Sequence, residues 1–383
     1  MKVICDRPAL LDAVNLVSSV VASRTPRPQL TAVKLTAAKA AGGAGSLTLC
    51  GTDAEASLRL TITRVDVQKS GEALIPADKL RAIVQAEESE ATLTLEADAD
   101  SCVIRGADAR FKIFGFPPAD FPPIPDFPAS SKGPFSLPAG EFAHLISRTI
   151  FAAARELSRY AFNGVLLKRE GKKLEMVATD GRRLALARSS LSGAADLPKE
   201  PTSCIIPTKA LNLVLKLIRD PEQSVRVALV DNQIVFAFGE EGDPTRAVLA
   251  SNLVEGSFPN YDDVIPKDQD KKAAFNRETL MSGVRRAALL TNEESRGVRF
   301  ALDNDNLNLS SRAPEMGEAE IKVPLSTYNG EPITIGFNPG FITEALKVIA
   351  DEDVTFELKA PNKPGLLRAG PDFLYVVMPV NLQ

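Results

Sequence analysis

The sequence predicts an α+β protein that consists of three tandem copies of one domain. Amphipathic helices recur along the chain, and each is followed by segments in which apolar and polar residues alternate. The pattern repeats at a spacing of about 130 residues, which is an ordinary domain length. The 383 residues are enough for three such units, each burying its own core.

Each copy is predicted to begin with a helix that has one apolar face. Apolar residues recur there at intervals of three, four and seven, as on one side of an α-helix. Leu11, Phe142 and Leu280 occupy equivalent places in the three helices. The apolar stripes consist of Leu10, Val14, Val17 and Val21; Phe142, Leu145, Ile146, Thr149 and Ile150; and Leu280, Val284, Ala287 and Ala288.

Strands and a second helix are predicted to follow in every copy. Alternation such as that of Leu58, Leu60 and Ile62 indicates a sheet with one buried face. A proline marks the start of each second helix, because the first helical turn does not need the missing N–H. These prolines are Pro76, Pro207 and Pro339.

The repeats place the predicted domains at residues 1–130, 131–267 and 268–383. The first copy closes with a proline-rich stretch at 116–128, and the second closes with a similar segment at 254–259. We interpret the proline-rich stretch as a stiff connector between domains. The alternative interpretation is a polyproline ligand.

The composition argues against several classes of protein. No apolar run reaches the roughly 18 residues of a membrane span, and Asp6 comes too early for a signal peptide, so a cytoplasmic protein is expected. The single histidine, His144, disfavours metal and acid–base chemistry, and we expect no metal and no cofactor. The four cysteines are too far apart for a metal site or a disulfide framework and are expected to be small buried hydrophobes: Cys5, Cys50, Cys102 and Cys204. The net charge of −4 argues against a surface that binds nucleic acid everywhere, but it permits a local basic face.

Three motifs resemble the bacterial β sliding clamp family, the β subunits of DNA polymerase III. RYAFNGVLL at 159–167, followed by VATDGRRLA at 177–185, resembles the central signature of that family. Residues 291–299 resemble the start of its third domain, and YVVMPV at 375–380 resembles its C-terminus. The likeness covers the whole chain.

The resemblance implies a ring and a function. It implies a head-to-tail homodimer of three-domain chains, with helices lining the lumen and antiparallel sheets outside. It implies a processivity factor, not an enzyme, that encircles duplex DNA without sequence preference. The implied partners are a second copy of the chain, the catalytic subunit of the replicative DNA polymerase, an ATP-dependent clamp loader and other proteins with a clamp-binding motif, and no membrane.

A sliding tether should touch DNA only through weak contacts from basic residues to phosphates. By resemblance, Arg24 and Tyr160 fall at positions where the family touches DNA. The residues expected at the DNA include Arg24, Arg27, Arg148, Arg155, Tyr160, Lys209, Arg285 and Arg286.

The resemblance also implies an apolar cleft that binds short peptides with leucine and phenylalanine anchors. Its expected residues are Phe162, Thr179, Gly181, Arg182, Arg183, Leu184, Pro259, Val264, Val376, Val377, Met378 and Pro379. Arg182 and Asp263 depart from the family pattern, which often has a histidine and a basic residue there. Without the resemblance, 376–378 would be interpreted as a core strand and 179–181 as a simple turn.

Ring closure is expected to pair an edge strand of the first domain with an edge strand of the third, because an exposed edge otherwise favours aggregation. Phe111 and Ile113 are the candidates to face Leu289 and Leu290 across this joint. The alternative for each of the four is packing within its own domain.

Two other functions remain open at this point. One is an enzyme that uses Asp53 or Asp180, each of which follows a threonine at the end of a strand. Their equivalent places in two repeats favour repeated turn chemistry instead, and the third copy has 310–312 (Ser-Ser-Arg) at that place. The other is a scaffold of repeated domains with no role on DNA.

Overall fold

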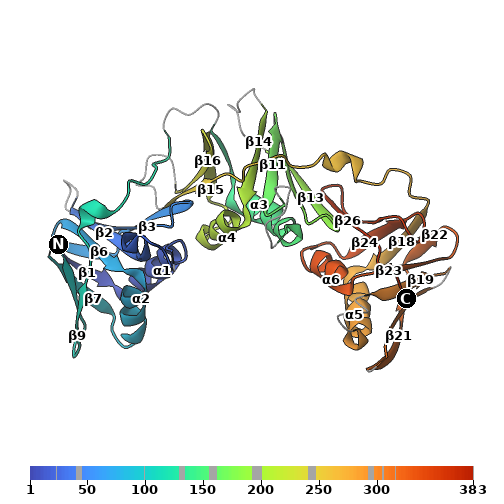
Figure 1. Ribbon diagram of the computed structural model, residues 1–383, viewed down its shortest axis with the longest axis horizontal. Helices are drawn as coiled ribbons and strands as arrows, with labels where there is room; N and C mark the ends of the chain where they lie inside the picture. The colour runs from blue at the N-terminus through green and yellow to red at the C-terminus, as the bar shows by residue number, and fades with distance from the viewer. Residues whose placement is uncertain are drawn as a thin grey trace. The chain divides into compact units, whose positions relative to one another are not determined.

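The structure is a computed structural model of the chain. It describes residues 1–22, 24–39, 45–98, 100–128, 134–154, 162–191, 201–239, 247–291, 297–303, 306–314 and 316–382. The described residues form two compact units, one drawn from 1–143 and 209–253, the other from 144–191, 201–208 and 254–382. Figure 1 shows both with their labelled elements.

Two antiparallel sheets make up the strands of the first unit. The five-stranded sheet has the order β5 (Val65–Lys69), β1 (Lys2–Asp6), β7 (Thr92–Ala97), β8 (Ser101–Arg105), β9 (Arg110–Phe114). The eight-stranded sheet has the order β10 (Phe135–Pro138), β15 (Ser224–Val230), β16 (Gln233–Phe238), β17 (Ala247–Asn252), β4 (Ala56–Ile62), β3 (Gly45–Thr52), β2 (Ala32–Lys39), β6 (Gly71–Pro76). Strands of the first two repeats therefore form one continuous sheet, joined by the pairing of β17 with β4.

The second unit has the same plan. Its nine-stranded sheet has the order β14 (Thr202–Pro207), β11 (Gly164–Glu170), β12 (Lys173–Thr179), β13 (Arg183–Ser190), β26 (Phe373–Val377), β25 (Gly365–Ala369), β24 (Asp353–Leu358), β18 (Lys271–Asn276), β22 (Thr327–Asn329). Its four-stranded sheet has the order β21 (Gly317–Pro324), β20 (Asn306–Ala313), β19 (Val298–Leu302), β23 (Ile333–Phe337). The second repeat pairs with the third through β13 and β26.

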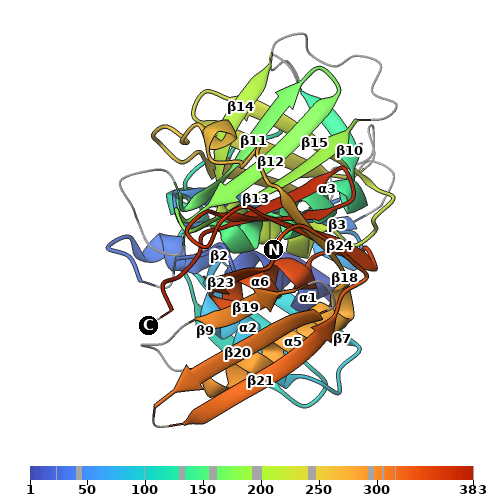
Figure 2. The ribbon, with the colours of Figure 1, turned by 90° about the vertical axis from the view of Figure 1, so that its right-hand side faces the viewer.

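The helices occur in the predicted order, one near the start and one near the middle of each copy. They are α1 (Arg7–Ser18) and α2 (Ala77–Ala86), α3 (Ala139–Ser147) and α4 (Thr208–Leu217), and α5 (Arg277–Ala287) and α6 (Pro339–Lys347). Figure 2 shows α1 and α2 of the first unit and α5 and α6 of the second from the side. The three tandem α+β copies predicted from the periodicity are confirmed.

Local sequence determines where the helices begin and end. The Asp6 carboxylate accepts the Ala9 N–H at 2.9 Å and caps α1. Asn276 and Asn338 cap α5 and α6 in the same way. The apolar stripes continue beyond the helices: α1 ends at Ser18, three residues before Val21, and the other two stripes run into the 3₁₀ turns Ile150–Ala152 and Ala288–Leu290.

The eight-stranded sheet is covered on both faces. A Cβ at Gly51 would lie 2.7 Å from Val17 of α1, so the helix packs against this strand through a glycine. Cys50, the neighbouring residue, points to the opposite face, where it packs with Phe121 of the connector at 116–128. The connector therefore packs along the sheet, and Phe127 contacts β16 and β17 further on. A second connector, residues 254–266, packs on the nine-stranded sheet and is drawn in gold in Figure 1.

The buried side chains agree with the composition. All four cysteines are free and buried, and burial raises the pKa of Cys5, Cys102 and Cys204 to about 12. Among the described residues, none of the helices is long and apolar enough to cross a membrane.

Candidate functional site

The turn between β12 and β13 is held by its own threonine and aspartate. The Thr179 hydroxyl donates to the Arg183 carbonyl at 2.6 Å and accepts the Gly181 N–H at 3.1 Å. Asp180 Oδ1 accepts the N–H groups of Arg182 and Arg183 at 2.9 and 3.1 Å. Gly181 has a φ of +83°, a conformation that favours glycine. These bonds do not involve the Arg182 side chain, which is exposed.

The same turn occurs between β3 and β4. The Thr52 hydroxyl donates to the Ala56 carbonyl at 2.8 Å and accepts the Ala54 N–H at 3.1 Å. Asp53 Oδ1 accepts the N–H groups of Glu55 and Ala56 at 2.9 and 2.8 Å. Asp53 and Asp180 therefore fulfil the same structural role in two repeats, as the repeated Thr-Asp pairs predicted. In the third repeat, the Ser311 hydroxyl donates to the Ala287 carbonyl at 2.6 Å.

The strand beside each turn extends the match but changes its chemistry. The Met378 N–H donates to the Arg182 carbonyl at 2.9 Å, and the Asn252 N–H donates to the Glu55 carbonyl at 2.8 Å. In the first unit the Asn252 side chain also donates to the Glu55 carboxylate at 3.0 Å. Asn252 and Glu55 of the first unit thus correspond to Met378 and Arg182 of the second, and only the first pair is joined by a polar contact between the two side chains.

Arg183 fixes the second turn to the rest of its unit. Its guanidinium donates to Asp180 at 3.0 Å, to the Phe151 carbonyl at 2.7 Å and to the Glu344 carboxylate. It also lies 4.4 Å from the ring centroid of Phe341, within cation–π range. The residue is only 7% exposed, so this arginine is structural and its cation is fully occupied.

An apolar cavity of about 120 Å³ lies beside this turn. It is lined by Phe162, Thr179, Gly181, Arg182, Arg183, Leu184, Pro259, Tyr261, Val264, Val376 and Met378. An apolar cavity of roughly 150 Å³ accepts a benzene-sized group, so this cavity suits one aromatic or leucine side chain. Ten of the twelve predicted cleft residues, all but Val377 and Pro379, therefore surround one cavity.

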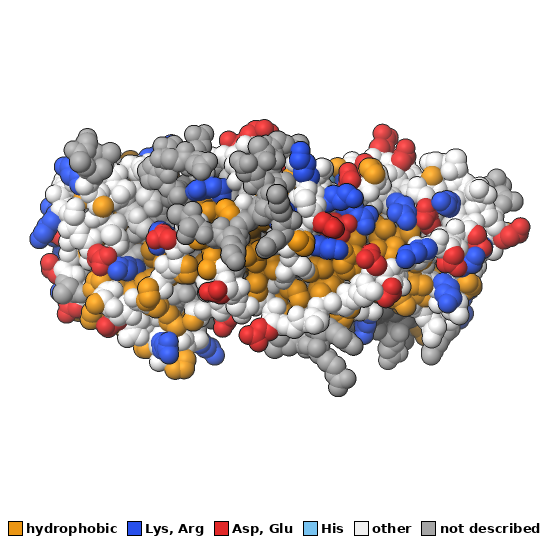
Figure 3. Space-filling view, turned by 90° about the horizontal axis from the view of Figure 1, so that it is seen from above, with side chains coloured by type: hydrophobic (Ala, Val, Ile, Leu, Met, Phe, Trp, Pro, Cys, Tyr) orange, Lys and Arg blue, Asp and Glu red, His pale blue; other side chains and the backbone are white. Residues whose placement is uncertain are grey.

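The remaining residues of this region divide between core and rim. Val377 is fully buried in β26, as the core-strand alternative predicted, and Pro379 is half-buried just after the strand. Val264 and Met378 are 45% and 39% exposed, so they offer apolar surface at the mouth of the cavity. Figure 3 shows hydrophobic side chains on the upper face of the second unit, in the right-hand half, with charged groups around them.

Tyr261 lines the cavity but was not among the predicted residues. It is the first residue of the 3₁₀ turn η4 (Tyr261–Asp263) in the second connector. The available signal was its place two residues after Pro259, in a segment that repeats the aromatic and proline pattern of the first connector.

The residues expected at the DNA differ in availability. Arg24 and Arg27 are exposed after α1, and Arg285 and Arg286 are exposed in the last turn of α5. Lys209 is exposed but forms an ion pair with Asp53. Arg155 and Tyr160 lie outside the described residues.

Arg148 does not fit the expectation of a phosphate contact. It is 7% exposed, donates to Asp351 at 3.3 Å and lies over the ring of Phe373. Burial lowers its pKa, although Asp351 and Asp372 partly offset this. The expectation was wrong because Arg148 is buried and paired. The sequence does not reveal this pairing, since Asp351 lies 203 residues further along the chain.

The residues expected at the ring joint also divide. β9 and β21 are edge strands of their sheets. Ile113 is 7% exposed and packs inside its own domain, contrary to the prediction, whereas the adjacent Phe114 is 73% exposed. Phe111 is half-buried. Leu289 is 72% exposed in η5 (Ala288–Leu290), and Leu290 is half-buried beside it.

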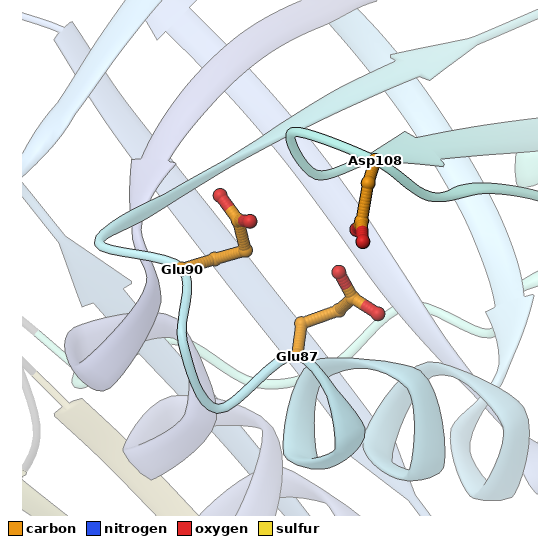
Figure 4. A group of neighbouring side chains, drawn as sticks. All are labelled: Glu87, Glu90 and Asp108. Carbon is orange, nitrogen blue, oxygen red and sulfur yellow. The ribbon is translucent and has the colours of Figure 1, made fainter.

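Two other features of the first unit do not match a predicted site. A groove of about 600 Å³ lies beside α1 and β4, and the exposed ion pair of Asp12 with Arg219 is part of its wall. Figure 4 shows Glu87, Glu90 and Asp108, whose carboxylate oxygens lie within 4.8 Å of one another. Within the described part of the chain this is the group close enough for a cation, but all three residues are at least partly exposed and we assign no ion to them.

Comparison with known proteins gives one consistent family. The N-terminal, central and C-terminal domains of the DNA polymerase III beta subunit match residues 1–125, 136–260 and 262–381. The beta sliding clamp of Pseudomonas aeruginosa is 33% identical over 379 residues, 98% of each chain. That of Escherichia coli K12 is 31% identical over 384 residues, 100% of each chain.

Solved structures agree with the sequence matches. The Pseudomonas aeruginosa sliding clamp bound to griselimycin superposes with a TM-score of 0.90 at 32% identity over the whole of both chains. The Bacillus subtilis clamp has a TM-score of 0.90 at 24% identity, which is evidence of the shared fold alone.

Proposed function

Because the chain belongs to the beta sliding clamp family of DNA polymerase III, we propose that it encircles duplex DNA as a head-to-tail homodimeric ring. It is a processivity factor for DNA replication, and its domains correspond to residues 1–130, 131–267 and 268–383. The observation that carries this proposal is the match of all three family domains, in order, along one chain. We propose that it acts in the cytoplasm and catalyses no reaction.

Duplex DNA would be held by enclosure and by weak phosphate contacts. The exposed arginines Arg24, Arg27, Arg285 and Arg286 are suited to such contacts, because guanidinium groups bind phosphates without reading bases. Each contact is screened by salt and exchanges easily, so the ring could move along the duplex. The net charge of −4 leaves the rest of the surface unattractive to DNA.

Partner proteins would dock at the cavity beside Arg182. The replicative polymerase, the ATP-dependent clamp loader and other proteins with a clamp-binding motif would each insert leucine or phenylalanine side chains. Burial of one such anchor in the cavity contributes about 1.5 to 3 kcal/mol before the cost of ordering the peptide. Griselimycin, which is bound to the Pseudomonas aeruginosa relative, would bind this chain too.

Ring closure would join β9 of one protomer to β21 of its partner. Both are edge strands, and pairing would satisfy their free backbone groups. The exposed Phe114 and Leu289 would then be buried, in place of Ile113, which packs within its own domain.

Retention on DNA circles tests the proposal. The chain is loaded onto nicked circular DNA by a cognate loader with ATP, washed in salt, and the circle is then cut. Retention before the cut and release after it are expected for topological enclosure. Equal loss from circular and linear DNA would refute enclosure and leave a scaffold or surface binder. Metal-dependent turnover of a substrate would instead support the enzyme alternative.

A further inference from the structure

A polar pair lies on the same face of the sheet as the cavity. Glu175 and Arg188 face each other across β12 and β13, and Arg188 Nε donates to Glu175 Oε1 at 2.7 Å. Four residues further along the same strands, Thr179 pairs with Leu184, and both line the cavity. Because residues an even number apart share a face of a strand, the charged pair and the cavity wall lie on one surface.

Tyr261 connects this pair to the second connector. Its hydroxyl donates to Glu175 Oε2 at 3.0 Å, and its ring meets that of Phe258 edge-on at 6.4 Å. The residue is 7% exposed and lies between Pro259 and Val264, which line the same cavity. The Glu175 carboxylate therefore holds the segment that forms one wall of the cavity, although Glu175 is not part of the lining.

The ionisation of both groups agrees with this geometry. Burial alone would raise the pKa of Glu175, but the hydrogen bonds from Arg188 and Tyr261 hold it below its usual value. Burial, together with the nearby Glu175 charge, raises the pKa of Tyr261. At neutral pH the carboxylate is thus charged and the phenol is a donor, which makes their hydrogen bond charge-assisted and strong.

We propose that Glu175 and Tyr261 are positioning residues of the partner cleft: their hydrogen bond fixes the connector wall before a peptide arrives. The inference rests on the proposed peptide binding at this cavity. Without the bond, the connector must be ordered at the moment of binding, and this cost weakens affinity. The Glu175 side chain acts through Tyr261 and is not expected to touch the peptide.

Tyr261→Phe removes the hydroxyl and keeps the ring, so it isolates the bond. Binding of a fluorescein-labelled synthetic peptide with leucine and phenylalanine anchors is measured by anisotropy on the full-length chain. We expect about tenfold weaker binding for Tyr261→Phe, since one charge-assisted hydrogen bond is lost, and at least that loss for Glu175→Val, which also removes the acceptor of Arg188. Glu175→Gln keeps an acceptor oxygen and should restore most of the affinity. Tyr328→Phe is the matched control, because that hydroxyl donates to the Glu331 carbonyl in a segment that does not line the cavity.

A double variant separates positioning from general destabilisation. Tyr261→Phe combined with Glu175→Val should bind no more weakly than the weaker single variant, because both remove the same bond. The loss should also persist at temperatures well below the unfolding midpoint of each variant. Affinity of Tyr261→Phe within about twofold of the wild type, or fully additive losses, would overturn the inference. Failure of the wild type itself to bind the peptide would instead reject the proposed cleft, and with it this inference.

Discussion

Arg183 and Arg182 are neighbouring arginines with opposite surroundings, so their substitution by glutamine gives a sharp test. Arg183→Gln removes the donors to Asp180, to the Phe151 carbonyl and to Glu344. Arg182→Gln changes an exposed side chain whose backbone alone belongs to the turn. The two variants lose the same charge from adjacent positions, and they differ only in what that charge contacts.

The structure gives the expected size of the effect. Removal of one partner from a buried ion pair costs about 3 to 5 kcal/mol. The side chains of Asp180 and Glu344 are 18% and 34% exposed, so water replaces part of what they lose. We therefore expect Arg183→Gln to cost about 2 to 3 kcal/mol, whereas surface changes such as Arg182→Gln stay within about 0.5 kcal/mol.

Calorimetry on the full-length chain measures the difference. For a unit of this size, the loss corresponds to a fall of about 5 to 10 °C in the unfolding midpoint of the second unit. Peptide binding should fall in Arg183→Gln as well, because the turn it fixes forms part of the cavity wall. Equal midpoints for the two variants would refute the assignment of Arg183 as the anchor of the turn.

Three further predictions concern the other proposed surfaces. Phe114→Glu should shift the dimer toward monomer in sedimentation velocity at micromolar concentration, since a charge replaces an apolar group at the proposed joint; an unchanged dimer would place the joint elsewhere. Replacement of Arg285 and Arg286 by serine should weaken binding to linear duplex DNA at low salt more than at high salt, and wild-type affinity of this variant at low salt would exclude them as phosphate contacts. Asp53→Asn should destabilise the first unit by up to about 1 kcal/mol at neutral pH: burial raises the pKa of Asp53, but Lys209 and the backbone N–H groups of Ala56 and Glu55 together outweigh burial and lower it. Because the pKa of Asp53 is lower in the folded chain, its carboxylate stabilises the fold at pH values above the unfolded pKa of 3.8, and this stabilisation is lost as the pH falls through the folded pKa. The urea midpoints of the variant and the wild type should therefore converge in acid, and a difference between the midpoints that stays constant with pH would contradict this.

Much of the fold could be predicted because it depends on local patterns. The helices followed from apolar spacing, and the starts of the second helices followed from Pro76, Pro207 and Pro339. The Thr-Asp turns could be predicted as turns because the hydrogen bonds that the threonine hydroxyl and the aspartate Oδ1 form within them are local. The apolar cleft could not be predicted from local patterns. These patterns favoured a core strand at 376–378 and a simple turn at 179–181, and only the family resemblance indicated a cleft.

The missed features depend on long-range contacts. Alternation along β9 separates Ile113 from Phe114, but it does not reveal which face the rest of the domain covers. The sequence does not show that Arg148 forms an ion pair with Asp351, so it predicted an exposed cation at this position. Tyr261 and Glu175 are 86 residues apart, and no local pattern relates them.

The repeated Thr-Asp turn has a consequence for how these proteins change over time. Threonine and aspartate supply the hydrogen bonds of the turn, so the exposed residue within it, Arg182 or Glu55, can be exchanged without disturbing the backbone. In one copy the exposed residue lines an apolar cavity, and in the other it forms a polar bridge to Asn252. Under the proposed function, a single codon change at this position would alter partner preference while the scaffold stays intact, and partners that dock at the same cavity would have to take turns.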